Sequence, residues 1–226
     1  DDKTLLPKEN LIPYIYKVDS IENLKVFLNG NAELQFVLII NNTGLTKEQS
    51  FNKVLSFFTY NYGSGKSVIQ VQDKEAGQII GKGLYKDFAY NSFSIKYMMT
   101  ETNYRYSFSA YHILQIDIKE SRMRIILTVQ NLDETFETIP RSPYMSNNPF
   151  SKSIGDLSPF QKSKVITDKK LKGLDKVGNE SVKGLEESEK IAFKELCQSC
   201  KQTLEDFQKS ILDKSDKSNK VNTDTW

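Results

Sequence analysis

The chain has few of the residues from which metal sites and disulfide frameworks are built. Its 226 residues include two cysteines and one histidine. Structural zinc sites draw four ligands from cysteine and histidine, and disulfide-stabilised domains carry several cysteine pairs. This scarcity excludes a multi-cysteine framework and a histidine-rich metal centre. We therefore expect no metal, no cofactor and no catalytic residue set.

The sequence also has no long apolar run and no excess of one charge sign. No stretch approaches the roughly 20 apolar residues that a membrane-spanning helix needs, so we expect no transmembrane segment in the given chain. The formal net charge is +2. Because binding to nucleic acid requires a strongly basic surface, we expect no nucleic-acid partner. The 13 Phe and 11 Tyr residues can fill a sizeable core.

One segment imitates a nucleotide-binding loop. Gly63-Ser64-Gly65-Lys66-Ser67 contains the Gly-Lys-Ser core, but Tyr60 occupies the position of the first glycine of a phosphate-binding loop. Such a loop leads from a strand into a helix. Here a predicted helix precedes the glycines, and the alternating residues 67–72 that follow are typical of a strand. We therefore expect no nucleotide binding at this segment.

The residues before this loop predict a strand and a capped helix. Residues 33–40, ELQFVLII, are typical of a strand. Thr46 and Gln49 then form a capping box, and the helix is expected to run to about Tyr60. One face of this helix is apolar and should lie on a sheet, and it comprises Phe51, Val54, Leu55, Phe58 and Tyr62.

The residues after the loop predict two hairpins. The first joins strands 67–72 and 78–86, and Gly81 and Gly83 leave room on one face for another element. The second joins two alternating strands within residues 104–130 around Glu120-Ser121. Its expected register puts His112 on the apolar face and is defined by the pairs Ile116 with Ile125 and Asp117 with Arg124. Residues 87–103 read as an insertion between the hairpins.

The ends of the chain differ from this central part. Residues 1–32 form an N-terminal extension, and the Pro-, Ser- and Asn-rich residues 131–164 predict a linker. Residues 165–212 are expected to be helical, and residues 213–226 a disordered tail. The helix carries an apolar stripe suited to docking on the sheet or on a partner protein: Phe193, Cys197, Cys200, Leu204, Phe207 and Ile211.

The order of elements and the motifs of residues 45–83 resemble an exported bacterial family whose domain has no known function (DUF4468). The matching segments are Ser67-Val68-Ile69-Gln70, Asp73-Lys74-Glu75-Ala76-Gly77 and Ile79-Ile80-Gly81-Lys82-Gly83. The similarity extends over about residues 33–130. It implies a fold like that of the TATA-binding protein, TBP: an α+β curved antiparallel sheet with a packed helix, here with a C-terminal helix added.

The resemblance also implies an exported protein of the periplasm or cell envelope, whose leader is absent from the given chain. It implies no catalytic residues. Asp19-Ser20-Ile21 matches a short pattern for O-glycosylation of exported proteins in the bacterial group that carries this family, which makes Ser20 a candidate modification site. DNA binding does not follow from the name of the fold, because fold does not determine function.

Four residues could bind an anionic group on the sheet. The alternation places Arg105, Tyr111, Arg122 and Arg124 on the face opposite the apolar one. The alternative is a solvated sheet face, in which Arg124 is neutralised by Asp117 across the hairpin. We expect the solvated face.

The residues with the most reactive side chains lack partners in the sequence. His112 has no second histidine near it, and we expect a structural role. Cys197 and Cys200 form C-x-x-C without a preceding strand or a second pair, so packing thiols and a strained disulfide remain the alternatives.

These features together predict a non-catalytic envelope protein that acts by binding or assembly. The partner is an unknown protein or envelope component, bound through the C-terminal helix in one version of this hypothesis. The alternative is a module for a small molecule or lipid, with a cavity between sheet and helix. A filled core favours the first hypothesis, and an apolar cavity near Phe36, Leu55 and Phe58 favours the second.

Overall fold

The computed structural model describes residues 21, 24–28, 33–62, 65–97, 100–139, 150–153 and 176–213. Its strands are β1 (Leu24–Leu28), β2 (Leu34–Asn41), β3 (Ile69–Asp73), β4 (Gln78–Tyr97), β5 (Thr100–Lys119), β6 (Arg122–Ile139) and β7 (Phe150–Ser153). Its helices are α2 (Lys47–Asn61), α3 (Gly65–Val68) and α5 (Lys176–Leu212). Ser20 lies outside the described residues.

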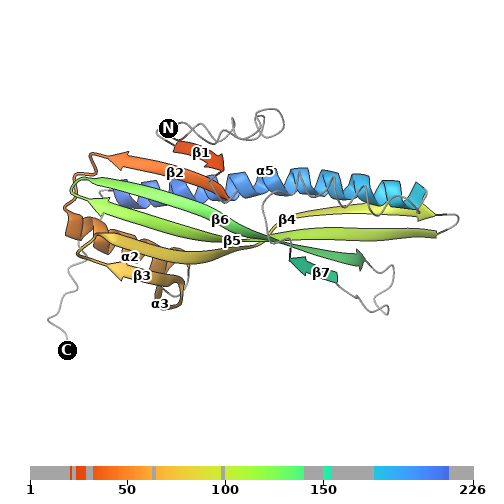
Figure 1. Ribbon diagram of the computed structural model, residues 1–226, viewed down its shortest axis with the longest axis horizontal. Helices are drawn as coiled ribbons and strands as arrows, with labels where there is room; N and C mark the ends of the chain where they lie inside the picture. The colour runs from red at the N-terminus through yellow and green to blue at the C-terminus, as the bar shows by residue number, and fades with distance from the viewer. Residues whose placement is uncertain are drawn as a thin grey trace.

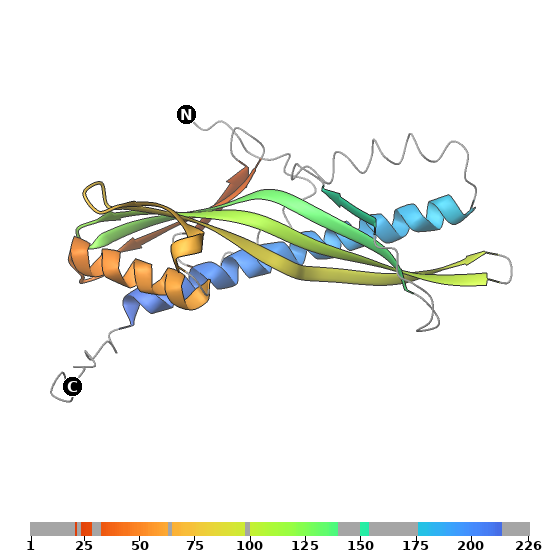
Figure 2. The same cartoon turned by 90° about the horizontal axis from the view of Figure 1, so that it is seen from below.

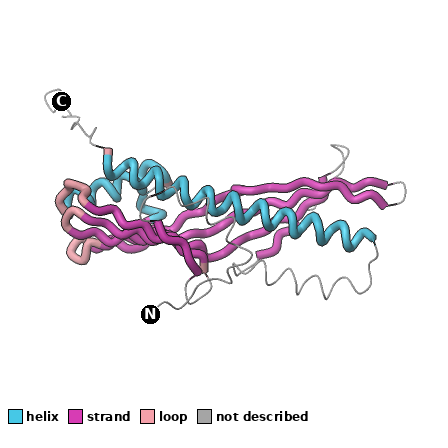
Figure 3. The backbone as a smooth tube through the Cα atoms, turned by 90° about the horizontal axis from the view of Figure 1, so that it is seen from above, coloured by secondary structure: helices cyan, strands magenta, loops and turns pink. Residues whose placement is uncertain are grey.

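The strands form one antiparallel sheet in the order β1-β2-β6-β5-β4-β3, and β7 pairs with the far half of β6 (Figure 1). Both α2 and α5 lie on the same face of this sheet (Figures 2 and 3). We call this the helix face, and we call the opposite side the open face. The α+β architecture with a curved antiparallel sheet is as predicted.

The capping box of α2 is present. The Thr46 hydroxyl accepts a hydrogen bond from the backbone N–H of Gln49 (3.2 Å), and the Gln49 side chain accepts one from the backbone N–H of Thr46 (3.0 Å). The helix buries Phe51, Val54 and Phe58 as expected. It also buries Phe57, because α5 lies beside α2.

The hairpin of β5 and β6 has the predicted register. Ile116 pairs with Ile125 and Asp117 with Arg124. Ser121 at the two-residue tip has a φ of 53°, which is the left-handed conformation that tight hairpin tips favour. The register places the buried side chains of both strands on the helix face.

Three predicted boundaries differ from the structure because the strands are longer than their local sequence suggested. β4 continues to Tyr97 and β5 begins at Thr100, so the described residues within 87–103 belong to the far half of one long hairpin and not to a separate insertion. A register shift between Tyr85 and Ala89 interrupts β4, which explains why its alternation broke there. β6 and β7 enter the range 131–164, and β1 lies within 1–32.

A smaller difference concerns the glycine-rich loop. Residues 65–68 form the short helix α3, and β3 begins at Ile69, two residues after the predicted start of the strand. Gly63 and Ser64 lie outside the described residues.

α5 docks on the helix face of its own chain, which is one of the two predicted alternatives. Its whole predicted stripe is buried, and Phe207 meets Phe57 edge-on with 4.9 Å between ring centroids. The N-terminal half of α5 approaches the far half of β4 closely. A Cβ atom on Gly184 would lie 2.9 Å from the ring of Phe93, and Ser188 accepts a hydrogen bond from Asn91 (3.0 Å).

Gly81 and Gly83 leave room for other side chains, as their alternation predicted. A Cβ atom on Gly81 would overlap the ring of Phe58 from α2. A Cβ atom on Gly83 would overlap both His112 and Tyr62. The two glycines therefore determine how closely α2 and the His112 ring approach the sheet.

We predict that Gly83→Ala destabilises the protein by about 1–3 kcal/mol, because the added methyl group forces apart packed rings. Chemical unfolding monitored by circular dichroism measures this loss. Lys82→Ala is the matched control, since Lys82 is exposed and its truncation should change stability by less than about 0.5 kcal/mol. Equal stability of the two variants would contradict this explanation of Gly83.

Candidate functional site

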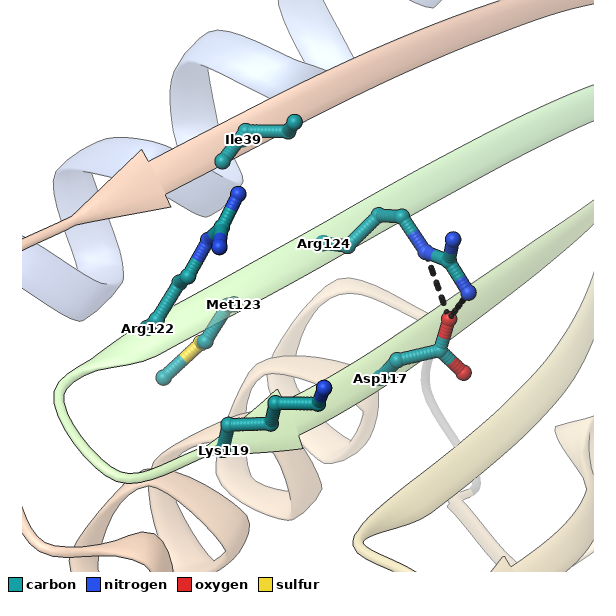
Figure 4. Close-up of a pocket in the computed structure, with 6 residues that line it drawn as sticks. All are labelled: Ile39, Asp117, Lys119, Arg122, Met123 and Arg124. Carbon is teal, nitrogen blue, oxygen red and sulfur yellow. Dashed lines mark hydrogen bonds and ion pairs between the residues drawn. The ribbon is translucent and has the colours of Figure 1, made fainter.

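A basic pocket lies on the open face at the tip of the β5–β6 hairpin. It has a volume of about 240 Å³ and is lined by Ile39, Asp117, Lys119, Arg122, Met123 and Arg124 (Figure 4). The lining comes from β2, β5 and β6. Register explains the arrangement, because Lys119 pairs with Arg122, Asp117 pairs with Arg124, and Ile39 pairs with Arg124 from the other side.

Asp117 and Arg124 form the ion pair that the sequence predicted. The Arg124 Nε donates to Asp117 Oδ2 at 2.8 Å (Figure 4). Asp117 also accepts hydrogen bonds from Gln78 (3.0 Å) and Gln115 (3.1 Å). Burial raises the pKa of Asp117, but the hydrogen bonds from Gln78, Arg124 and Gln115 outweigh it, so the pKa lies below its ordinary value.

The other two cations of the basic pocket are not neutralised in this way. Neither Lys119 nor Arg122 has a carboxylate partner among the described residues. With Arg124 paired to Asp117, the pocket retains two positive charges. Such a site attracts carboxylate or phosphate groups.

The structure divides the four predicted anion-binding residues. Arg122 and Arg124 share the basic pocket. Arg105 lies opposite Glu137 on the far half of the hairpin. Tyr111, which pairs with Leu84 and Asn131, lies along β5 between Arg105 and the basic pocket. The four therefore do not converge. Ile39 could not be assigned to the site from sequence, because its pairing with β6 joins strands that are distant in the chain.

The open face is apolar beside the basic pocket. Val37 pairs with Ile126, and Ile126 and Ile80 both pair with Gln115, so these side chains form a row across four strands. Val37, Ile80 and Ile126 are half-buried, and no described helix covers them. We call the row and the basic pocket together the open-face surface.

The only histidine is buried on the helix face. His112 is 2% exposed, its Nε2 hydrogen-bonds the Tyr62 hydroxyl (3.0 Å), and its ring stacks on Tyr85 with 4.1 Å between centroids. Burial lowers the pKa of His112 to about 4. Its Nδ1 has no hydrogen-bond partner among the described residues. This environment fits the structural role expected from the sequence.

The two cysteines are free and buried. Burial raises the pKa of Cys197 to about 12 and the pKa of Cys200 well above its ordinary value. Because the thiolate is the reactive form, neither thiol is activated. Among the described residues, no group of three His, Cys, Asp or Glu side chains is placed to hold a metal ion. No helix in the described part of the chain is long and apolar enough to cross a membrane.

Comparison with known proteins agrees with the predicted resemblance. Residues 36–129 match the family described as a domain of unknown function (DUF4468) with TBP-like fold, which confirms the resemblance and the fold class. No curated protein matches the chain.

Two solved structures are similar to the chain. A DUF4468 family protein from Bacteroides ovatus is 10% identical with a TM-score of 0.29, over 57% of this chain and 66% of that one. A TBP-like protein from Parabacteroides distasonis is 10% identical with a TM-score of 0.36, over 81% of this chain and 95% of that one.

We predict that Arg124→Ala costs less than about 1 kcal/mol of stability, because exposed ion pairs contribute little. Urea unfolding of the variant and the wild type gives the difference. Arg122→Ala, which removes no ion pair, serves as the comparison. A loss of several kcal/mol for Arg124→Ala would show that the Asp117 network stabilises the fold more strongly than its exposure implies.

The depressed pKa of His112 predicts a pH dependence. Histidine in the unfolded chain titrates near 6.5, and in the folded protein near 4. The unfolded state binds more protons between these two pH values. The contribution of neutral His112 to the free energy of unfolding is therefore complete above about pH 6.5 and is lost as the pH falls toward 4. The stability advantage of the wild type over His112→Gln should shrink by about 2–3 kcal/mol between pH 7 and pH 4. If the free energies of unfolding of the two proteins changed in parallel with pH, His112 could not be neutral and buried in the folded state.

Proposed function

We propose that this bacterial-type protein with a TBP-like domain is exported to the cell envelope and acts there by binding another macromolecule, without catalysis. The observation that carries this proposal is the open-face surface. Both α2 and α5 lie on one side of the sheet (Figure 2). On the other side, half-buried Val37, Ile80 and Ile126 are not covered by any helix that the structure describes. Export is supported by the family resemblance.

The charges of the basic pocket favour an acidic partner. Lys119, Arg122 and Arg124 line the pocket, and Asp117 is the one carboxylate among its lining residues. A partner segment with apolar side chains flanked by Asp or Glu would bury the row and pair with the two unneutralised cations. Two copies meeting through this surface would instead bring like charges together, which disfavours self-association.

The packing around Phe36, Leu55 and Phe58 favours this proposal over a carrier that holds a lipid or small molecule in an apolar cavity at that place. Phe36 and Phe58 are fully buried in the core, and Leu55 packs against the same core, so side chains occupy the place that the carrier alternative assigns to a cavity. Two features support a role without catalysis. Burial keeps the thiols of Cys197 and Cys200 protonated, and the His112 ring is hydrogen-bonded to Tyr62 and stacked on Tyr85.

Site-specific photo-crosslinking in the native host tests the proposal. A crosslinking residue at Ile126 reports on the open-face surface, and one at the exposed Lys194 reports on the outer side of α5. We predict a discrete product from position 126 in the envelope fraction and none from position 194. Lys119→Glu with Arg122→Glu should remove the product, whereas Lys194→Glu should not.

Two outcomes would contradict the proposal. One is the same product from both positions, which would mean that the contact does not select the open face. The other is a product at 126 that persists after the double charge reversal, which would exclude an acidic partner at the basic pocket.

A further inference from the structure

A second pocket lies on the helix face, where the C-terminal end of α2 meets β4 and α5. It has a volume of about 200 Å³ and is lined by Phe57, Asn61, Tyr62, Leu84, Tyr85, His112, Thr203 and Asp206. It lies beside the part of β4 beyond Gly81, where β3 no longer pairs with β4. We call it the seam pocket.

The walls of the seam pocket are aromatic rings held in place by their neighbours. Phe57 and Tyr62 meet edge-on at 6.3 Å between centroids, and Tyr85 stacks on His112. The Tyr62 hydroxyl is hydrogen-bonded to His112, and the Tyr85 hydroxyl is hydrogen-bonded to the Thr203 hydroxyl (2.8 Å). Because these contacts already hold the side chains in place, little side-chain entropy is lost when a ligand binds.

The described residues that line the seam pocket carry a negative charge. Asp206 is the one charged residue among them, and none of them is Lys or Arg. One Asp206 oxygen accepts a hydrogen bond from Gln202 (3.0 Å), and the other has no partner among the described residues. The last turn of α2, which ends here, contains no basic residue, so the negative end of the helix dipole is not offset within the helix.

The neighbouring surface extends this negative character. An adjoining depression shares Tyr85, Thr203 and Asp206 with the seam pocket and adds Glu195, and none of its described lining residues is Lys or Arg. Glu205 precedes Asp206 in α5 and forms an ion pair with Lys201 (3.6 Å). His112 adds no positive charge near neutral pH, because burial lowers its pKa to about 4.

We propose that the seam pocket binds the ammonium group of a small organic cation. Phe57, Tyr62 and Tyr85 line the pocket, aromatic rings attract cations through their negative π faces, and the exposed Asp206 supplies an opposite charge. The pocket is smaller than the sites of drug-sized ligands, which fits a single head group.

Other ligand classes fit the seam pocket less well. A phosphate or carboxylate would meet Asp206 without a cation to offset it. A Ca²⁺ or Mg²⁺ ion needs about six oxygen ligands, and the lining offers one carboxylate among aromatic rings. This inference is independent of the open-face surface, which lies on the other side of the sheet.

Titration with choline, followed by ¹H–¹⁵N NMR spectra of the full chain, tests the proposal. The control ligand is 3,3-dimethylbutan-1-ol, which has the shape of choline but no charge. We predict saturable shifts of the Tyr62, Tyr85 and Asp206 signals with choline, and binding about tenfold weaker for the neutral alcohol. Sodium chloride at equal ionic strength should not reproduce the shifts.

Two variants of α5 separate the role of Asp206 from a general effect of charge. Asp206→Asn should weaken choline binding about threefold or more. Glu187→Gln, an equal change at an exposed position farther along the same helix, should leave it unchanged. The proposal fails if the alcohol binds as tightly as choline, if the two variants behave alike, or if choline causes no saturable shift at these residues.

Discussion

The register between β5 and β6 determines which side chains enter the core and which line the basic pocket. Because side chains alternate along a strand, a shift by one residue would move every side chain of a strand to the opposite face. The pair Ile116 with Ile125 assigns the apolar side chains to the helix face. The same register gathers Lys119, Arg122 and Arg124 on the open face. Core and basic pocket are therefore two consequences of one alignment.

The two faces of the sheet place their titratable side chains in different environments. On the helix face, burial keeps His112 neutral and the two cysteines protonated, which suits a packed interior. On the open face, charged side chains keep their contact with water and can exchange it for contact with a partner. The seam pocket combines both conditions, since its rings are held by the core while Asp206 is exposed.

The sequence predicted what local patterns determine. The capping box of Thr46 and the tip at Glu120-Ser121 each involve residues close in the chain, and both were placed correctly. The pairing of Ile39 with Arg124 joins distant segments and left no local signal. The burial of Phe57 depends on contact with α5, which no pattern within α2 indicates. An irregularity before Ala89 interrupts the alternation of β4, so its far half resembles an insertion in the sequence.

α5 and the sheet share one core, and we propose that the open face is therefore the side available for binding. Native-state hydrogen exchange under increasing denaturant measures whether this core opens as one unit. We predict that amides of α5 between Cys197 and Phe207 exchange with the same free energy as those of Ile116 and Ile125. Exchange of α5 at a much lower free energy than the sheet would contradict a shared core, because the helix face would then open independently of the sheet.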